Sequence, residues 1–219
     1  RGRTMSGGQP PAYHFRQAST FASGGADMLS ALTMTNVTEA IGIVNAAREL
    51  SCPVSISFTV ETDGSLPTGQ ALAAAITEVD EATGGYPAYF MVNCAHPTHF
   101  AARLFEGGAW TRRVRGIRAN ASRCSHAELD AMTALDDGDP EELARFYCEL
   151  CERLPHISVL GGCCGTDIRH IAAIAPSCAA RERAVAQPEL VSAASDDVPF
   201  DGQLQGGSID VKSSAHLAP

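Results

Sequence analysis

The feature that most constrains this chain is the regular alternation of short, β-branched apolar runs with longer amphipathic runs. Short β-branched runs favour strands, whereas apolar residues that recur every three or four positions favour helices. Strands and helices in alternation are typical of βα units around a parallel sheet. The predicted strands cover residues 26–33, 53–60, 88–93, 114–119 and 157–160.

Helices are predicted between and around these strands. They cover residues 13–24, a run that ends at Leu50, residues 69–83, 97–107 and 140–154, and a final helix that ends near residue 175. Short polar side chains cap helices by accepting hydrogen bonds from the free N–H groups of the first turn. We therefore expect Asn36 or Thr38, Asp139 and Thr166 to cap three of these helices.

Five βα units fit part of a (β/α)8 barrel or an open doubly wound sheet. A closed barrel needs eight units and about 250 residues. About three units are therefore missing from this chain, and they are expected to precede Arg1. We predict a barrel domain over residues 1–178 that is incomplete at its N-terminal side. Residues 179–219 lack periodicity and are predicted to form a poorly ordered tail.

Composition limits the partners and the compartment. The chain has 25 Asp and Glu against 16 Lys and Arg, which argues against nucleic acid as a ligand because phosphate backbones require a basic surface. The arginines between Arg112 and Arg118 are expected to lie on a solvated face. No apolar run approaches the roughly 20 residues that span a bilayer, so no membrane partner is expected. The cysteines are too sparse for a disulfide scaffold, which indicates a reducing, cytoplasmic location.

Three cysteines follow predicted strands. Cys94 comes after residues 88–93, and Cys163 and Cys164 come after residues 157–160. In a parallel barrel, residues just past the carboxyl ends of the strands converge at one mouth. Adjacent residues of a strand point to opposite faces, so Cys163 and Cys164 share one ion only from an irregular turn, which the flanking glycines permit. Three thiolates favour zinc and leave a fourth tetrahedral position for substrate.

Buried, unreactive thiols are the alternative interpretation, since free cysteine is among the most buried residue types. A glycine-rich loop with two thiols fills a core poorly, which favours the metal site. Cys148 and Cys151 have the spacing of a redox motif but fall inside a predicted helix, where we expect burial. His96 and His99 are expected to cap a helix or to lie on the surface.

Three stretches of the chain resemble the homocysteine S-methyltransferase family. They are Thr62-Asp-Gly-Ser-Leu-Pro-Thr-Gly69, Val92-Asn-Cys94 and Gly161-Gly-Cys-Cys-Gly-Thr166. A weaker similarity covers residues 26–40, and the whole resemblance runs from about Tyr13 to Pro176. It implies a (β/α)8 barrel, of which this chain holds about the five C-terminal units. It also implies that Cys94, Cys163 and Cys164 hold the zinc.

The resemblance further implies an activity. The sulfur of L-homocysteine binds zinc as a thiolate and takes a methyl group from a small-molecule donor, which gives methionine. Asn93, Thr33 and Asn120 are the candidate substrate-binding residues, and Asn93 is alternatively expected to fix the metal loop. The donor itself is left open.

Two departures from the family's pattern support a second hypothesis. Leu32 stands where many relatives carry a glutamate that binds the substrate amino group, and the family's N-terminal Asp-Gly motif is absent from the chain. The alternative is therefore a catalytically incomplete fragment that binds zinc or homocysteine. A partial barrel exposes sheet edges, so copies of the chain are expected to associate as a homo-oligomer.

Overall fold

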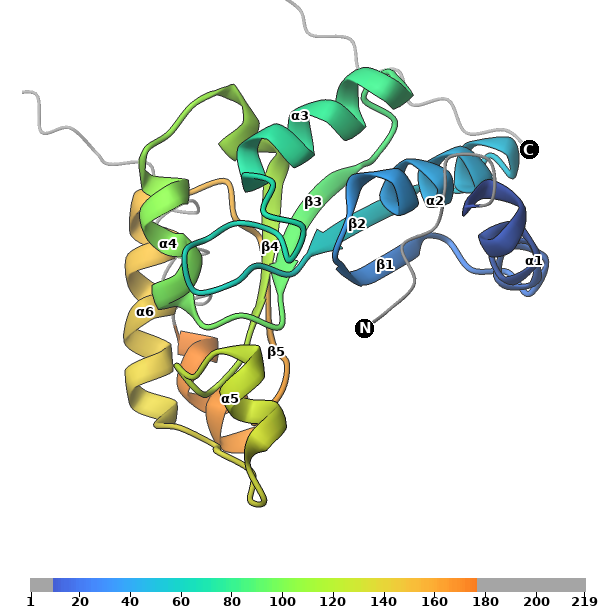
Figure 1. Cartoon of the computed structure of the whole chain (residues 1–219). Coiled ribbons are helices and arrows are strands. Elements are labelled where there is room, and N and C mark those ends of the chain that lie inside the picture. The colour runs from blue at the N-terminus through green and yellow to red at the C-terminus, as the bar shows by residue number, and fades with distance from the viewer. Residues whose placement is uncertain (1–9, 177–219) are drawn as a thin grey trace, which may run out of the picture. The chain divides into compact units, whose positions relative to one another are not determined.

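The structure, a computed structural model, describes residues 10–176 (Figure 1). Its strands form one sheet in the order β1-β2-β3-β4-β5, and each neighbouring pair is parallel. The strands are β1 (Leu29–Met34), β2 (Val54–Phe58), β3 (Tyr89–Asn93), β4 (Val114–Ala119) and β5 (Val159–Gly162). Sequential strands that lie side by side are the arrangement of a barrel wall, whereas a doubly wound sheet reverses its strand order. The barrel interpretation is therefore confirmed, with the described sheet left open.

Helices precede and connect the strands. They are α1 (Pro10–Ser23), α2 (Val37–Glu49), α3 (Leu72–Thr83), α4 (Pro97–Phe105), the 3-10 helix η1 (Ala109–Arg113), α5 (His126–Ala131) and α6 (Pro140–Arg153). A last helix begins at residue 168 and continues to the end of the described residues. Asn36 caps α2 and Asp139 caps α6, as predicted, because their side-chain oxygens accept N–H groups of the first turn.

The sequence prediction is wrong in three places near the carboxyl ends of the strands. Strand β5 lies two residues later than expected, because Gly161 and Gly162 pair with β4 despite their low intrinsic strand preference. Helix α5 was not predicted, since it has only six residues. Asp167 rather than Thr166 accepts the N–H of Arg169 in the last helix, while the Thr166 hydroxyl donates to the Cys163 carbonyl.

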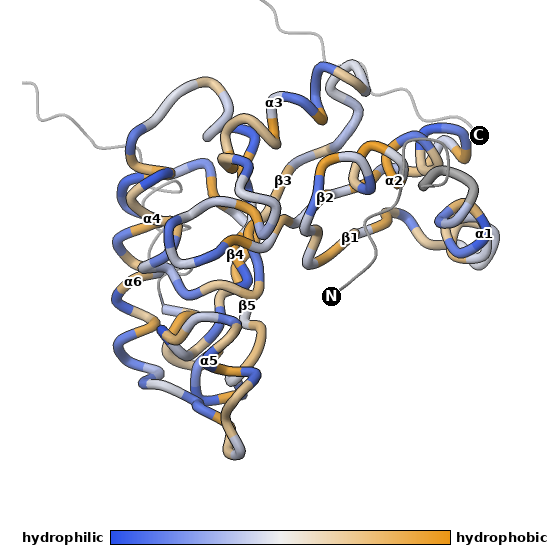
Figure 2. The backbone as a smooth tube through the Cα atoms, in the orientation of Figure 1, coloured by the Kyte–Doolittle hydropathy of each residue, from blue (hydrophilic) through white to orange (hydrophobic). Residues whose placement is uncertain are grey.

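The hydrophobic core lies on one face of the sheet, between the strands and the helices. Ile56, Phe90 and Ile117 are fully buried strand residues that belong to one cluster with Val44 and Tyr147 from the helices. Figure 2 shows hydrophobic residues along the strands and a mixture of hydrophobic and hydrophilic residues along α6. Side chains alternate across a strand, so the intervening residues of each strand point to the opposite, barrel-interior face.

The interior face carries mostly polar or small residues. Ser55 and Ser57 on β2, Asn93 on β3 and Gly116 on β4 are all buried there. Ser30 on β1 reaches Ser55 across the sheet, with 2.8 Å between their hydroxyl oxygens. A polar interior face near the carboxyl ends of the strands is where a (β/α)8 barrel places its site.

Two sequence predictions fall on the C-terminal part of the chain. The predicted domain boundary at residue 178 and the tail over residues 179–219 lie outside the described residues. No helix within residues 10–176 is long and apolar enough to cross a membrane.

Cys151 is buried in α6 as predicted, whereas the prediction of burial is wrong for Cys148, which is exposed at the edge of the buried face.

Candidate metal centre

The three cysteines singled out from the sequence meet at the carboxyl ends of β3 and β5. The Sγ atoms of Cys94 and Cys163 are 2.9 Å apart, and those of Cys94 and Cys164 are 3.7 Å apart. All three sulfurs lie within 4.8 Å of one another. Residues 69 positions apart in the sequence are therefore brought to one point by the parallel sheet.

The backbone at Cys94 is unusual, which explains how its thiol faces the other two. Cys94 has φ of 54°, in the left-handed region that residues other than glycine seldom adopt. Its N–H donates to the Arg118 carbonyl at 3.2 Å, so the turn is tied to β4. This conformation turns the chain sharply at the end of β3 and needs support from its neighbours.

His126 and Thr59 supply that support by donating to the Cys94 carbonyl. His126 Nε2 is 2.6 Å from this oxygen, and the Thr59 hydroxyl is 3.3 Å from it. His126 is the first residue of α5, which starts with a capping box between Ser125 and Glu128. Sequence analysis missed His126, although Ser125 and Glu128 have the spacing of a capping box and mark the helix that carries it.

Cys163 and Cys164 lie in an irregular turn after β5, as expected. The Cys163 N–H donates to the Ala119 carbonyl, and the Cys164 carbonyl accepts from Ala121. Gly165 has φ of 77°, and a β-carbon there would come within 2.6 Å of the Asp136 carbonyl oxygen. Only glycine fits this position without displacing the loop before α6.

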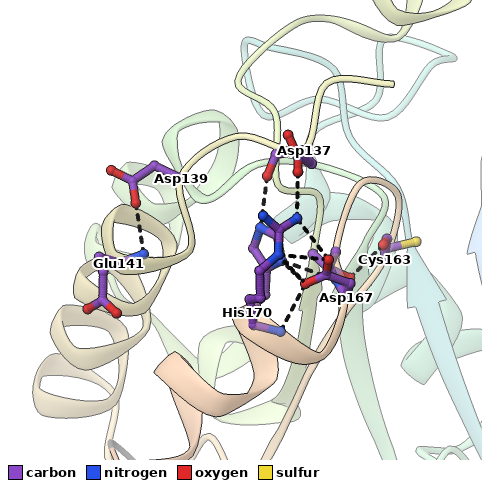
Figure 3. Close-up of polar contacts among 8 residues, drawn as sticks. Asp137, Asp139, Glu141, Cys163, Asp167 and His170 are labelled. Carbon is purple, nitrogen blue, oxygen red and sulfur yellow. Dashed lines mark hydrogen bonds and ion pairs between the residues drawn. The ribbon is translucent and has the colours of Figure 1, made fainter. Parts of the chain in front are cut away.

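The loop before α6 and the start of the last helix hold this turn from the other side (Figure 3). His170 is fully buried, accepts the Asp167 N–H at Nδ1 and places Nε2 2.8 Å from the Asp137 carbonyl. A carbonyl oxygen can only accept, so Nε2 donates to it, and Nδ1 also lies 3.1 Å from an Asp167 carboxylate oxygen. Arg169 joins the same two acidic residues by ion pairs. These hydrogen bonds and ion pairs join the start of the last helix to the loop before α6, and so they fix the turn that carries Cys163 and Cys164.

Asn93 is placed between the thiols and the first two strands. Its Nδ2 donates to the Thr33 hydroxyl at 2.7 Å and lies 3.9 Å from Cys163 Sγ. Its Oδ1 accepts the Thr33 N–H at 2.9 Å and the Ser57 hydroxyl at 2.6 Å. Asn93 is buried, and Thr33 has φ of 59°, which is unusual for a β-branched residue. Both residues therefore lie at the site, and their substrate contacts remain a prediction.

Asn120 also lies at the centre, on the β4 side. It is buried, and its Oδ1 accepts the Cys164 N–H at 3.1 Å. Its own N–H donates to the Ala95 carbonyl, so it joins the two cysteine-bearing loops. Asn120 thus holds the loop that carries Cys164, and its role in substrate binding stays a prediction.

The two histidines near Cys94 are not part of the thiol cluster. His96 caps α4, where its Nδ1 accepts the Thr98 N–H, and His99 Nε2 lies 2.9 Å from the Arg123 carbonyl. Burial is the main cause that lowers the pKa of His96 to about 4. Its role in capping agrees with the sequence prediction.

Hydrogen bonding divides the thiols into a strong and a weak acid. The Cys94 thiol donates to the Cys163 sulfur, which lowers the pKa of Cys163 to about 5. The same bond, with burial, raises the pKa of Cys94. The cluster therefore holds one thiolate before any metal binds, and metal binding would release the remaining protons.

The donor set fits zinc. Tetrahedral zinc with bonds of about 2.3 Å to sulfur separates its ligand sulfurs by about 3.8 Å. The distance between Cys94 and Cys164 matches this value, and Cys163 needs only a small outward movement from Cys94. Three soft sulfur ligands select zinc among common divalent ions and leave a fourth position for another ligand.

A cavity of about 180 Å³ adjoins the thiols on the side of α5. Cys94 and Cys164 form one wall, Asn120 and His126 contribute polar groups, and the other lining residues are Ser122, Leu129, Asp130, Ala134, Leu135, Asp136 and Gly165. The space is comparable to about six water molecules in the liquid. A small organic molecule therefore has room beside the thiols.

Comparisons with known proteins agree on the family and the fold. The chain is similar to solved structures of the homocysteine methyltransferase MmuM from Escherichia coli, with 20% sequence identity to each. For the apo form the TM-score is 0.59, over 80% of this chain and 60% of that chain. For the metallated form it is 0.58, over 78% and 52%, and for the oxidized form 0.61, over 80% and 53%.

These similarities support the fold, and the sequence profile supports the family. The chain spans between 52% and 60% of the length of these solved structures. No curated protein sequence matches it. The profile of the family described as homocysteine S-methyltransferase matches residues 4–178, which is most of the chain. The chain therefore belongs to the homocysteine S-methyltransferase family.

Proposed function

We propose that this protein transfers a methyl group to the sulfur of L-homocysteine and forms methionine, with zinc held by Cys94, Cys163 and Cys164. The observation that carries the proposal is the convergence of these three thiols within 4.8 Å in a member of this family. A bound zinc ion would lower the pKa of a coordinated substrate thiol and keep it as a nucleophilic thiolate.

The protein's own residues would orient the centre for this reaction. Methyl transfer to a thiolate needs alignment of the sulfur, the methyl carbon and the leaving group, and no general acid or base is required. Asn93 and Asn120 hold the two cysteine-bearing loops at fixed positions. The cavity beside Cys94 and Cys164 offers space for a reactant next to the sulfurs.

A second candidate is a fragment that binds metal or homocysteine without turnover. Two observations favour it: the sheet of the described residues is open, and Leu32, where relatives have a glutamate, is 40% exposed on the edge strand β1. The two candidates agree on the metal and differ in methyl transfer. A cytoplasmic location, the domain limit at residue 178 and association of copies through the sheet edges remain predictions.

The test is the zinc content of the purified, reduced chain, followed by X-ray absorption at the zinc edge. We expect about one zinc per chain with three sulfur neighbours, and a fourth sulfur after addition of L-homocysteine. Cys94→Ser, Cys163→Ser and Cys164→Ser should each lose stoichiometric zinc, whereas the exposed Cys148→Ser should keep it. Full zinc in all three variants would reject the proposed centre.

Methyl transfer is then assayed with homocysteine and sulfonium or quaternary ammonium donors. Methionine formation supports the enzyme. Zinc and homocysteine binding without methionine, for every donor tested, supports the binding fragment instead.

A further inference from the structure

Arg118 lies on the same face of the sheet as Asn93, close to the thiols. In the register of the sheet, Arg118 pairs with Asn93 on β3 and with Gly161 on β5. Its neighbour Ile117 is fully buried in the core on the opposite face. Since successive side chains alternate, Arg118 points to the interior face. The predicted solvated face agrees with the exposure of Arg112 and Arg115, whereas Arg118 is only partly exposed.

The Arg118 side chain lies against Gly161 of the neighbouring strand β5. A β-carbon at Gly161 would lie 3.5 Å from Arg118 Cγ and 3.7 Å from its Nε. These are ordinary van der Waals distances, so the stem of the arginine lies directly against the backbone of β5 at Gly161. Cys163 follows Gly161 by two residues, which is about 6.6 Å along a strand.

The Arg118 guanidinium has no carboxylate partner among residues 10–176, although it is only partly exposed. Five other arginines of the described chain have a carboxylate partner: Arg103 with Glu106, Arg113 with Asp80, Arg123 with Glu142, Arg153 with Glu149, and Arg169 with Asp137 and Asp167. Arg112, Arg115 and Arg145 also lack one, but they are exposed, whereas Arg118 is only partly exposed. A partly buried guanidinium favours an anion that satisfies its fork of N–H donors.

We propose that Arg118 binds the carboxylate of the homocysteine whose sulfur occupies the metal centre. This inference rests on the proposed function. An extended chain from the thiol sulfur of homocysteine to its carboxylate carbon spans about 5 Å, and Gly161, against which the arginine stem lies, is only two residues before Cys163. Arg118 and the three cysteines would then hold the two ends of one amino acid, and the sulfur would be fixed in direction as well as in distance from the metal.

The test measures thiol binding to the cobalt-loaded full chain by the sulfur-to-cobalt absorption band. The two ligands are L-homocysteine and 3-aminopropane-1-thiol, which keeps the thiol and the amine but lacks the carboxylate. We expect wild type to bind homocysteine more tightly. Arg118→Met should weaken homocysteine binding by about 10- to 100-fold, because one charge-assisted pair is lost. It should leave binding of 3-aminopropane-1-thiol unchanged.

Two further variants separate charge from folding. Arg118→Lys keeps the charge but not the planar fork, and it should retain part of the preference for homocysteine. Arg115→Met is the matched control, since Arg115 is an exposed residue near the start of the same strand. Cobalt stoichiometry and thermal unfolding are recorded for each variant, and Arg118→Gln replaces Arg118→Met if the latter does not fold.

The possible results are distinct. A preference for homocysteine that survives in Arg118→Met overturns the inference, as does an equal loss for both thiols, which would place the effect of Arg118 on the metal itself. Unchanged homocysteine binding with a raised KM for a carboxylate-bearing donor also overturns it, because the donor is then the ligand. Failure of both thiols to change the wild-type band removes the proposed function together with this inference.

Discussion

Asn93 and Thr33 exchange two hydrogen bonds across the sheet: Asn93 Oδ1 accepts the Thr33 N–H, and Asn93 Nδ2 donates to the Thr33 hydroxyl. The pair joins the end of β3 to β1, with Ser57 of β2 as a third member. It holds Thr33 in a left-handed conformation that is costly for a β-branched residue. Asn93, the residue before Cys94, thus joins the carboxyl ends of three strands.

Asn93→Ala should lower the free energy of unfolding by about 1 to 3 kcal/mol, because it leaves the Thr33 N–H and the buried Ser57 hydroxyl without their acceptor. Denaturant unfolding measures this change. Asn45→Ala, which removes only an exposed bond to Arg48, should cost less than about 0.5 kcal/mol. Equal effects of the two substitutions would contradict the structural role of Asn93.

His126→Ala should weaken zinc binding by about 10- to 100-fold, because Cys94 then loses the shortest bond that holds its left-handed backbone. Competition with a chelator gives the affinity. His126→Gln keeps an N–H donor at similar reach and should restore part of the affinity. The control is His156→Ala, since His156 bonds a carbonyl away from the centre, that of Thr111. Wild-type affinity in His126→Ala would show that Cys94 needs no such support.

Cys163 should be the first thiol of the metal-free cluster to react with iodoacetamide. The hydrogen bond from Cys94 lowers the pKa of Cys163 to about 5, so Cys163 is a thiolate at pH 6 to 7, where an ordinary cysteine is protonated. Peptide mass spectrometry after brief alkylation identifies the site. In Cys94→Ala the main donor is absent, and the rate at pH 6 should fall, while Asn93 and Cys164 still lower the pKa of Cys163 in part. Preferential labelling of Cys94 would contradict the assignment.

Tyr147→Phe should lower the free energy of unfolding at neutral pH by about 1 to 3 kcal/mol. The buried Tyr147 hydroxyl accepts the Ala119 N–H and donates to the Gly161 carbonyl at 2.5 Å, so it bridges β4 and β5 beside the metal turn. Chemical denaturation of both proteins measures the difference. Tyr86→Phe, which removes a longer bond from a half-buried hydroxyl to Cys52, should cost less.

Tyr147→Phe should also reduce the dependence of the free energy of unfolding on pH in the alkaline range. Burial raises the pKa of Tyr147 above its ordinary value. Above about pH 10 the unfolded chain loses this proton while the folded protein keeps it, so folding is disfavoured as pH rises. Wild type should therefore lose its advantage over Tyr147→Phe at alkaline pH. A constant difference across this range would mean that the hydroxyl is not buried as described.

The sequence by itself determined the parallel architecture and the three thiols. Alternating β-branched and amphipathic runs are local signals, and capping residues such as Asn36 and Asp139 act within one helical turn, so both are readable without a fold. The glycines around Cys163 and Cys164 indicated an irregular turn for the same reason. Those features depend on neighbours in the chain.

Only the tertiary structure decided which distant residues support the centre. His126 touches the Cys94 carbonyl across 32 positions, and Asn120 reaches the Cys164 N–H across 44. Strand β5 includes two glycines because β4 pairs with them, against their intrinsic preference. Arg118 looked like one charge of a solvated run, yet the side-chain alternation of β4 turns it to the interior face. Register and long-range hydrogen bonds follow from how the strands assemble, and no local pattern encodes them.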